Sequence, residues 1–99
     1  MPKPPPSVQR NARAALEARA NASPSNRGMT PVGIARARDL ANGRNVSERT
    51  LKRMVSFLSR HRVDKKGSTW NRKGKGWQAW NGWGGNEAYQ WAKSLLGRK

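Results

Sequence analysis

The sequence predicts an all-α fold, and three features of the chain support this prediction. In several segments, apolar residues recur at the three- and four-residue spacing of an amphipathic helix. Thr, Ser, Pro, Asn and Gly stand at the edges of these segments, where helices begin and end. No segment shows the sustained alternation of apolar and polar residues that is typical of a strand. We therefore expect a small bundle of short helices with a Trp-rich C-terminal part, preceded by a Pro-rich, flexible N-terminal arm.

Residues 1–28 have the composition of an arm rather than of a packed domain. Residues 1–6 are rich in proline, which favours an extended polyproline-type conformation. Ser7 can cap a marginal helix that ends near Ala20, and a turn-forming stretch follows it. The apolar stripe of this helix is mostly alanine, so burial adds little to its stability. We expect a flexible basic arm over residues 1–28 and a compact domain over residues 29–97.

Two amphipathic helices are expected next, joined by an Asn-Gly turn. The first begins at Thr30, a good cap that is followed by proline, and it ends at Asn42 and Gly43. The second follows the cap Ser47 and ends at His61. The pair resembles a helix-turn-helix, with a longer link than the usual tight turn. The second helix has a well-defined apolar stripe, made of Leu51, Met54, Val55 and Leu58.

The remaining segment contains a basic loop and then two helical pieces. Residues 63–76 mix Lys and Arg with Gly, Ser and Thr, which predicts a mobile loop. A short helical turn is expected over residues 77–80, and Gly82–Gly85 predict a sharp turn. A last helix should begin after the cap Asn86 and stop at Gly97.

The five tryptophans have two interpretations. They can form a platform on which unpaired bases stack, as in proteins that bind single strands. They can instead build the core of a small domain that lacks disulfides. We assign Trp80, Trp83 and Trp91 to the core. Trp70, which stands alone among basic residues, is the candidate for stacking on a base.

The charge of the chain indicates a polyanionic partner. Lys and Arg number 21 and Asp and Glu 5, which gives a formal net charge of +16. A compact monomer with this charge repels itself, whereas binding to nucleic acid releases condensed counterions. No apolar run approaches the roughly 20 residues that span a membrane, so no membrane partner is expected. We expect nucleic acid, and DNA rather than RNA, as the partner.

The candidate binding residues lie on the helix after Ser47 and in the loop that follows it. On a helical wheel the cations of this helix gather within about a third of the circumference, opposite the apolar stripe. A merely solvated face usually mixes both signs of charge, whereas Glu48 is the only acid in this helix. We expect phosphate contacts from Arg49, Lys52, Arg53, Arg60, Arg62, Lys65, Lys66, Arg72, Lys73 and Lys75.

Enzymatic function is not expected. The chain has no cysteine, which excludes a thiolate metal site. Its one histidine, His61, stands at a helix end, and stabilisation of the helix dipole accounts for a histidine at that position. Metal-ligand spacings, a phosphate-binding glycine loop and a nucleophile–base pair are all missing from the sequence. We expect no catalytic residue, no metal and no cofactor.

About residues 29–92 resemble a small basic helical domain encoded by tailed bacteriophages, including phages of marine cyanobacteria. The matching segments are GIARARDL (33–40), NG (42–43), VS (46–47), T (50), RM (53–54), SF (56–57), RH (60–61), AW (79–80), WGG (83–85) and WA (91–92). The resemblance implies a phage-encoded protein located in the host cytoplasm or nucleoid, or inside the virion. It implies no particular activity. The chain is richer in Lys, Arg and Trp than the family pattern, which favours nucleic acid as the partner.

Two alternatives to DNA binding stay open. In the first, the chain is a phage head or assembly protein that binds an acidic protein surface. In the second, it is directed at the host and binds an acidic host protein. A steep salt dependence of binding to DNA would favour the nucleic-acid interpretation over both.

Overall fold

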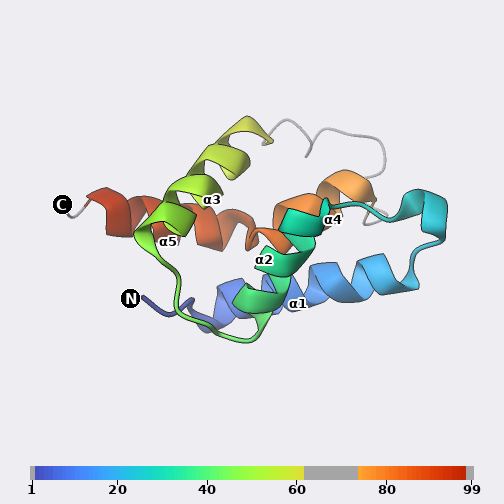
Figure 1. Cartoon of the computed structure of the whole chain (residues 1–99), viewed down its shortest axis with the longest axis horizontal. Helices are drawn as coiled ribbons and strands as arrows, with labels where there is room; N and C mark the ends of the chain where they lie inside the picture. Colours follow the sequence, from blue (N-terminus) through green and yellow to red (C-terminus); the bar gives the residue numbers. More distant parts are fainter. Residues whose placement is uncertain (1, 62–73, 98–99) are drawn as a thin grey trace.

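The computed structural model describes residues 2–61 and 74–97. Within these residues every regular element is helical, which confirms the predicted all-α class (Figure 1). The elements are α1 (Pro6–Asn21), the short 3-10 turn η1 (Pro24–Asn26), α2 (Pro31–Ala41), α3 (Glu48–Arg60), α4 (Lys75–Gly82) and α5 (Gly85–Gly97).

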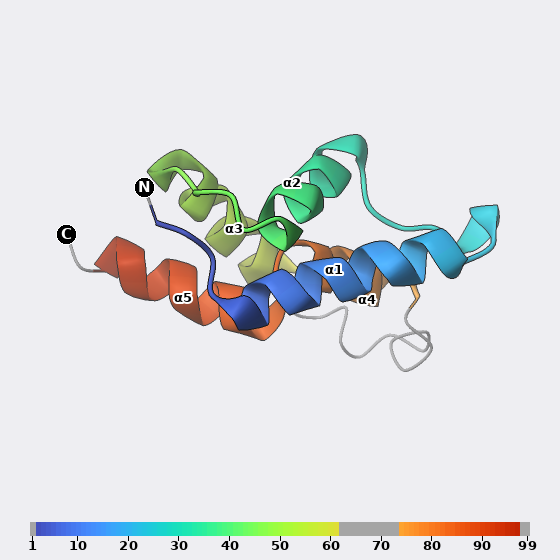
Figure 2. The same cartoon turned by 90° about the horizontal axis from the view of Figure 1, so that it is seen from below.

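Helix α1 is part of the hydrophobic core. Val8, Ala12 and Ala15 are fully buried, and the helix packs mainly against α2 and α4. Seen from below, α1 lies in front of α4 (Figure 2). This arrangement differs from the expected arm outside the compact domain, because residues on both sides of position 28 share one core. An alanine stripe adds little apolar area, but its small side chains let neighbouring helices approach closely.

The proline-rich segment before α1 is also attached to the fold. Pro4 is fully buried, and its carbonyl oxygen accepts a hydrogen bond of 2.8 Å from Gln9 Nε2. The carbonyl oxygen of Pro2 accepts one of 2.7 Å from the amide of Val46, in the link before α3. Helix α1 begins at Pro6 and is capped by Pro5, two residues earlier than expected, so Ser7 lies in its first turn and not at the capping position. Proline is favoured at position 6 because its fixed φ suits the first helical position.

Helices α2 and α3 begin where the sequence predicts. The Thr30 hydroxyl accepts a hydrogen bond of 3.1 Å from the amide of Gly33, and the Ser47 hydroxyl accepts one of 3.2 Å from the amide of Thr50. Gly43 ends α2 with a φ of 69°, the left-handed conformation that glycine adopts easily. However, α3 packs mainly on α5 and α2 mainly on α1. The two helices therefore do not form the closely packed pair of a helix-turn-helix.

The C-terminal helices bury the tryptophans assigned to the core to different degrees. Trp80 and Trp83 are 3% and 7% exposed, whereas Trp91 is partly buried and packs against the core cluster. Between α4 and α5 the backbone turns at Gly84, where φ is 103° and a Cβ atom would collide with Ala88. Helix α5 begins at Gly85, so Asn86 lies in its first turn and not at the expected capping position.

Among the helices in the described part of the chain, none is both long enough and apolar enough to cross a membrane.

Candidate nucleic-acid interface

Helix α3 exposes a row of cations on the side away from its buried stripe. Leu51, Met54 and Leu58 are buried beneath the helix, and α3 packs there mainly against α5. The opposite side carries four exposed cationic side chains, which we call the α3 cationic face: Arg49, Lys52, Arg53 and Arg60. The exposure of these four residues agrees with their predicted position on the helix.

The acids near this face compensate little of its charge. Lys52 Nζ lies 3.6 Å from Glu48 Oε1, and both side chains are largely exposed. An exposed pair of this kind contributes only about 0–1 kcal/mol, so a phosphate can replace the carboxylate. Within the described residues, no acid forms an ion pair with Arg49, Arg53 or Arg60. A phosphate could therefore contact these three arginines without first breaking an ion pair among the described residues.

An aromatic stack attaches the C-terminal end of α3 to the rest of the molecule. The ring of Phe57 lies between those of His61 and Trp83, with centroid distances of 4.2 Å and 4.8 Å. The guanidinium carbon of Arg36, on α2, lies 6.0 Å from the centroid of the Trp83 ring. We call Phe57, His61 and Trp83 the aromatic stack. Because the stack joins α3 to the α4–α5 turn, it helps to fix the direction in which the cationic face points. It also gives His61 a packing role that the sequence did not reveal.

The predicted basic loop falls mostly outside the described part of the chain. Arg62, Lys65, Lys66, Trp70, Arg72 and Lys73 lie outside the described residues. Lys75, the last cation predicted for the loop, is the first residue of α4 and is exposed. The structure contains a cavity at the C-terminal end of α3, and both Lys75 and His61 line it.

Further exposed cations lie on other helices, and the sequence pattern predicts no binding role for them. One of them, Arg13, joins two helices, because its Nη2 atom donates a hydrogen bond of 3.0 Å to the carbonyl oxygen of Ala41. The high net charge was the only signal for this group, since the residues form no motif. The exposed cations of α1, α2 and α5 are Arg10, Arg13, Arg38 and Lys93.

The described residues contain no group of three or more His, Asp or Glu side chains that could hold a metal ion. Comparisons of the chain with protein-family models, with curated proteins and with solved structures found no match. Over the described residues, the fold and this surface define a small all-α protein with a strongly basic helix face.

Proposed function

We propose that the protein binds nucleic acid, and DNA in particular, through phosphate contacts of the α3 cationic face. The observation that carries the proposal is the arrangement of Arg49, Lys52, Arg53 and Arg60 on the exposed side of one helix. The buried side of that helix is fixed by the core and by the aromatic stack. A rigid row of cations loses little conformational freedom when it meets a row of phosphates, and a helix fits the major groove of DNA.

Release of counterions supplies the free energy of binding in this proposal. Each phosphate that the protein neutralises contributes about −0.9 to the slope of log K against log[salt] on duplex DNA. Four contacts from the α3 cationic face give a slope of about −4, and engagement of the further cations of the chain makes it steeper. Phosphate contacts position the protein but do not read the sequence. We therefore expect similar affinities for duplexes of different sequence.

The proposal is tested with a charge-matched pair of triple variants. The first, Arg49→Ala/Arg53→Ala/Arg60→Ala, removes three cations from the α3 cationic face. The second, Arg10→Ala/Arg38→Ala/Lys93→Ala, removes three exposed cations from other helices. Fluorescence anisotropy with a labelled duplex, over a series of salt concentrations, gives the slope for each protein.

The first variant should bind more weakly and lose about three units of slope, whereas the second should lose less. Circular dichroism should show both variants folded, since exposed substitutions usually change stability by no more than about 0.5 kcal/mol each. Equal losses in the two variants would mean that net charge matters and that α3 has no special role. A wild-type slope near zero would contradict the proposal as a whole.

The second candidate function is a phage head, assembly or host-directed protein that binds an acidic protein surface. It is favoured by the resemblance of residues 29–92 to a phage-encoded domain, and the α3 cationic face would suit carboxylates as well as phosphates. Tight, salt-resistant binding to an acidic phage or host protein, together with weak binding to DNA, would support it.

A further inference from the structure

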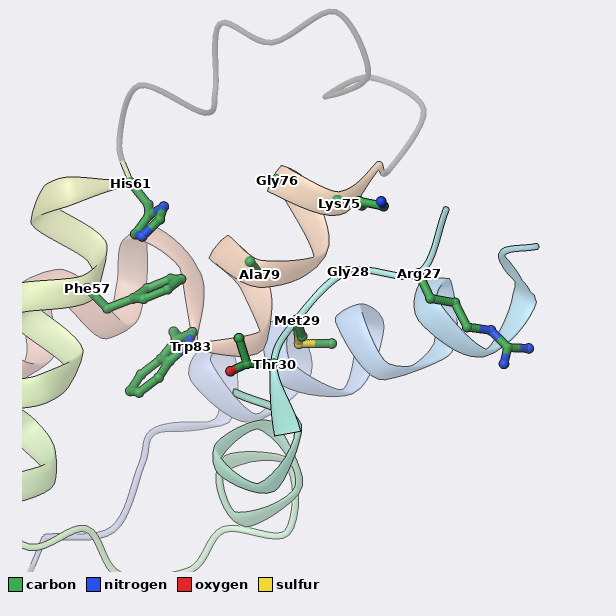
Figure 3. A pocket seen from close by; sticks show the side chains of 10 residues that line it. All are labelled: Arg27, Gly28, Met29, Thr30, Phe57, His61, Lys75, Gly76, Ala79 and Trp83. Atoms are coloured by element: carbon green, nitrogen blue, oxygen red, sulfur yellow. The ribbon is translucent and has the colours of Figure 1, made fainter. Parts of the chain in front are cut away.

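A cavity of about 470 Å³ lies beside the C-terminal end of α3 (Figure 3). The aromatic stack forms one side of it, and Arg27 and Lys75 lie on the other side. Met29 lies between the two sides. The volume of the cavity falls within the range of about 300–1,000 Å³ that is usual for small-molecule sites.

The aromatic wall suits a flat, unsaturated ligand. Both faces of the Phe57 ring are covered by His61 and Trp83, so its edge is the part left for a ligand. Figure 3 shows this ring directed from α3 towards Ala79 of α4. Aromatic ring edges carry partial positive charge and prefer to meet the face of another π-system. Met29 also lines the cavity. A thioether of this kind makes favourable contacts with aromatic rings.

The cations of the cavity suit an anion attached to that ligand. Figure 3 shows the side chains of Arg27 and Lys75 directed away from the aromatic stack, towards the outside of the cavity. Both are exposed. Arg27 Nε donates a hydrogen bond of 3.2 Å to the carbonyl oxygen of Ala22, which holds the guanidinium on the side away from the aromatic stack. A ligand with a flat ring inside the cavity and phosphates outside it would match this distribution.

The wall opposite the aromatic stack is held in place by a buried side chain. Gln78, on α4, is 1% exposed. Its Oε1 atom accepts a hydrogen bond of 2.7 Å from the amide of Gly28, and its Nε2 atom donates one of 3.1 Å to the carbonyl oxygen of Asn26. Arg19 Nε donates another of 3.0 Å to the carbonyl oxygen of Gly28. A Cβ atom on Gly28 would lie 2.8 Å from the backbone of Lys75, so only glycine fits there without a shift.

Met29 has the unusual backbone conformation that often accompanies a binding site. Its φ is 71°, and it is the only non-glycine residue with a positive φ among the described residues. A residue with a Cβ atom pays of order 1 kcal/mol for this conformation, which persists where the surroundings fix it and is concentrated at ligand-binding sites. The hydrogen bonds of Gly28 and the contact of the Met29 sulfur with Gly82 provide such surroundings. These contacts hold Met29 in its place on the lining of the cavity.

We infer that this cavity binds one unpaired nucleobase of the nucleic acid, while the neighbouring phosphates contact Arg27 and Lys75. The inference rests on the proposed function. It adds to that function a preference for nucleic acid that contains an unpaired base. The cavity lies at the end of α3, about 18 Å from Arg49 by the rise of the helix. A strand that follows the α3 cationic face thus reaches the cavity within several nucleotides.

The test compares a fully paired duplex with the same duplex carrying one unpaired 2-aminopurine. At fixed salt, the duplex with the unpaired base should bind roughly 2- to 12-fold more tightly, which is the factor for one edge-to-face aromatic pair. The fluorescence of 2-aminopurine should change on binding. Ala79→Phe, which places a ring in the cavity, should abolish the difference and leave binding to the paired duplex unchanged.

A second variant keeps the test decisive if Ala79→Phe fails to fold. Arg27→Ala/Lys75→Ala should reduce the preference for the unpaired base more than the charge-matched Arg10→Ala/Arg38→Ala does. Equal affinity of the wild-type protein for the two duplexes overturns the inference and leaves the proposed function intact. Absence of binding to either duplex overturns the proposed function. Binding of free deoxyadenosine monophosphate without a preference for the unpaired duplex also overturns the inference.

Discussion

At the scale of the residue, the tryptophans show how differently one amino-acid type is used in this chain. Trp80 is almost fully buried, Trp83 is buried and joins the aromatic stack, and Trp91 covers the edge of the core. A small protein without disulfides depends on such large side chains, because each buries much apolar surface. The cost of truncating each tryptophan should therefore follow its burial.

Replacing Trp80 with alanine should lower the free energy of unfolding by about 3–5 kcal/mol. This is a large part of the total stability of a small domain, which is commonly about 5–15 kcal/mol. Urea denaturation followed by far-ultraviolet circular dichroism measures the change. Trp91→Ala is the matched control and should cost less, because Trp91 is only partly buried. Equal costs for the two variants would contradict the packing described for α4.

At the scale of the element, α1 is the helix whose role differs most from the expectation. Besides its buried stripe, α1 is tied to later segments by polar side chains. Asn11 Nδ2 donates a hydrogen bond of 2.8 Å to the carbonyl oxygen of Gly84, and Arg13 and Arg19 donate to the carbonyl oxygens of Ala41 and Gly28. These contacts connect α1 with α2, with the cavity wall and with the α4–α5 turn.

Deleting residues 1–27 should therefore lower the thermal midpoint strongly or prevent folding. The deletion removes the fully buried Val8, worth roughly 1.5–3 kcal/mol by itself, and uncovers the faces of α2 and α4 that pack on α1. Thermal denaturation of the truncated and full-length proteins checks this. Val8→Ala should be destabilising, and Arg10→Ala on the exposed side of the same helix should not. An unchanged midpoint after truncation would show that α1 is a separate arm.

The elements show which parts of this fold can be predicted from the sequence. The caps Thr30 and Ser47 and the stripe of α3 were predictable because each depends on neighbours within one helix. The packing of α1 was not, because it depends on how closely its alanines approach other helices. Likewise, the cationic positions of α3 followed from helical periodicity. The cavity combines Arg27, Phe57 and Lys75, and only the tertiary fold brings these residues together.

At the scale of the whole molecule, the net charge of +16 opposes folding, because the cations repel one another. Salt screens this repulsion, since the Debye length falls from about 30 Å at 0.01 M to about 8 Å at 0.15 M ionic strength. The thermal midpoint should therefore rise with sodium chloride over this range. The variant Arg49→Ala/Arg53→Ala/Arg60→Ala should show a smaller rise, because it carries less charge. A midpoint independent of salt in the wild-type protein would mean that repulsion does not limit its stability.

The aromatic stack should contribute to the near-ultraviolet circular dichroism of the protein. Three rings held at fixed distances and nearly parallel, with interplanar angles of 23° and 19°, form an asymmetric chromophore that includes one indole. Such a group gives a near-ultraviolet dichroic band that disappears when side-chain packing is lost, even while helical content remains. Trp83 thus contributes to that band a signal from the junction of α3 with the α4–α5 turn, alongside the other described tryptophans. Any ligand that displaces His61 or Phe57 would be recorded there without a dye.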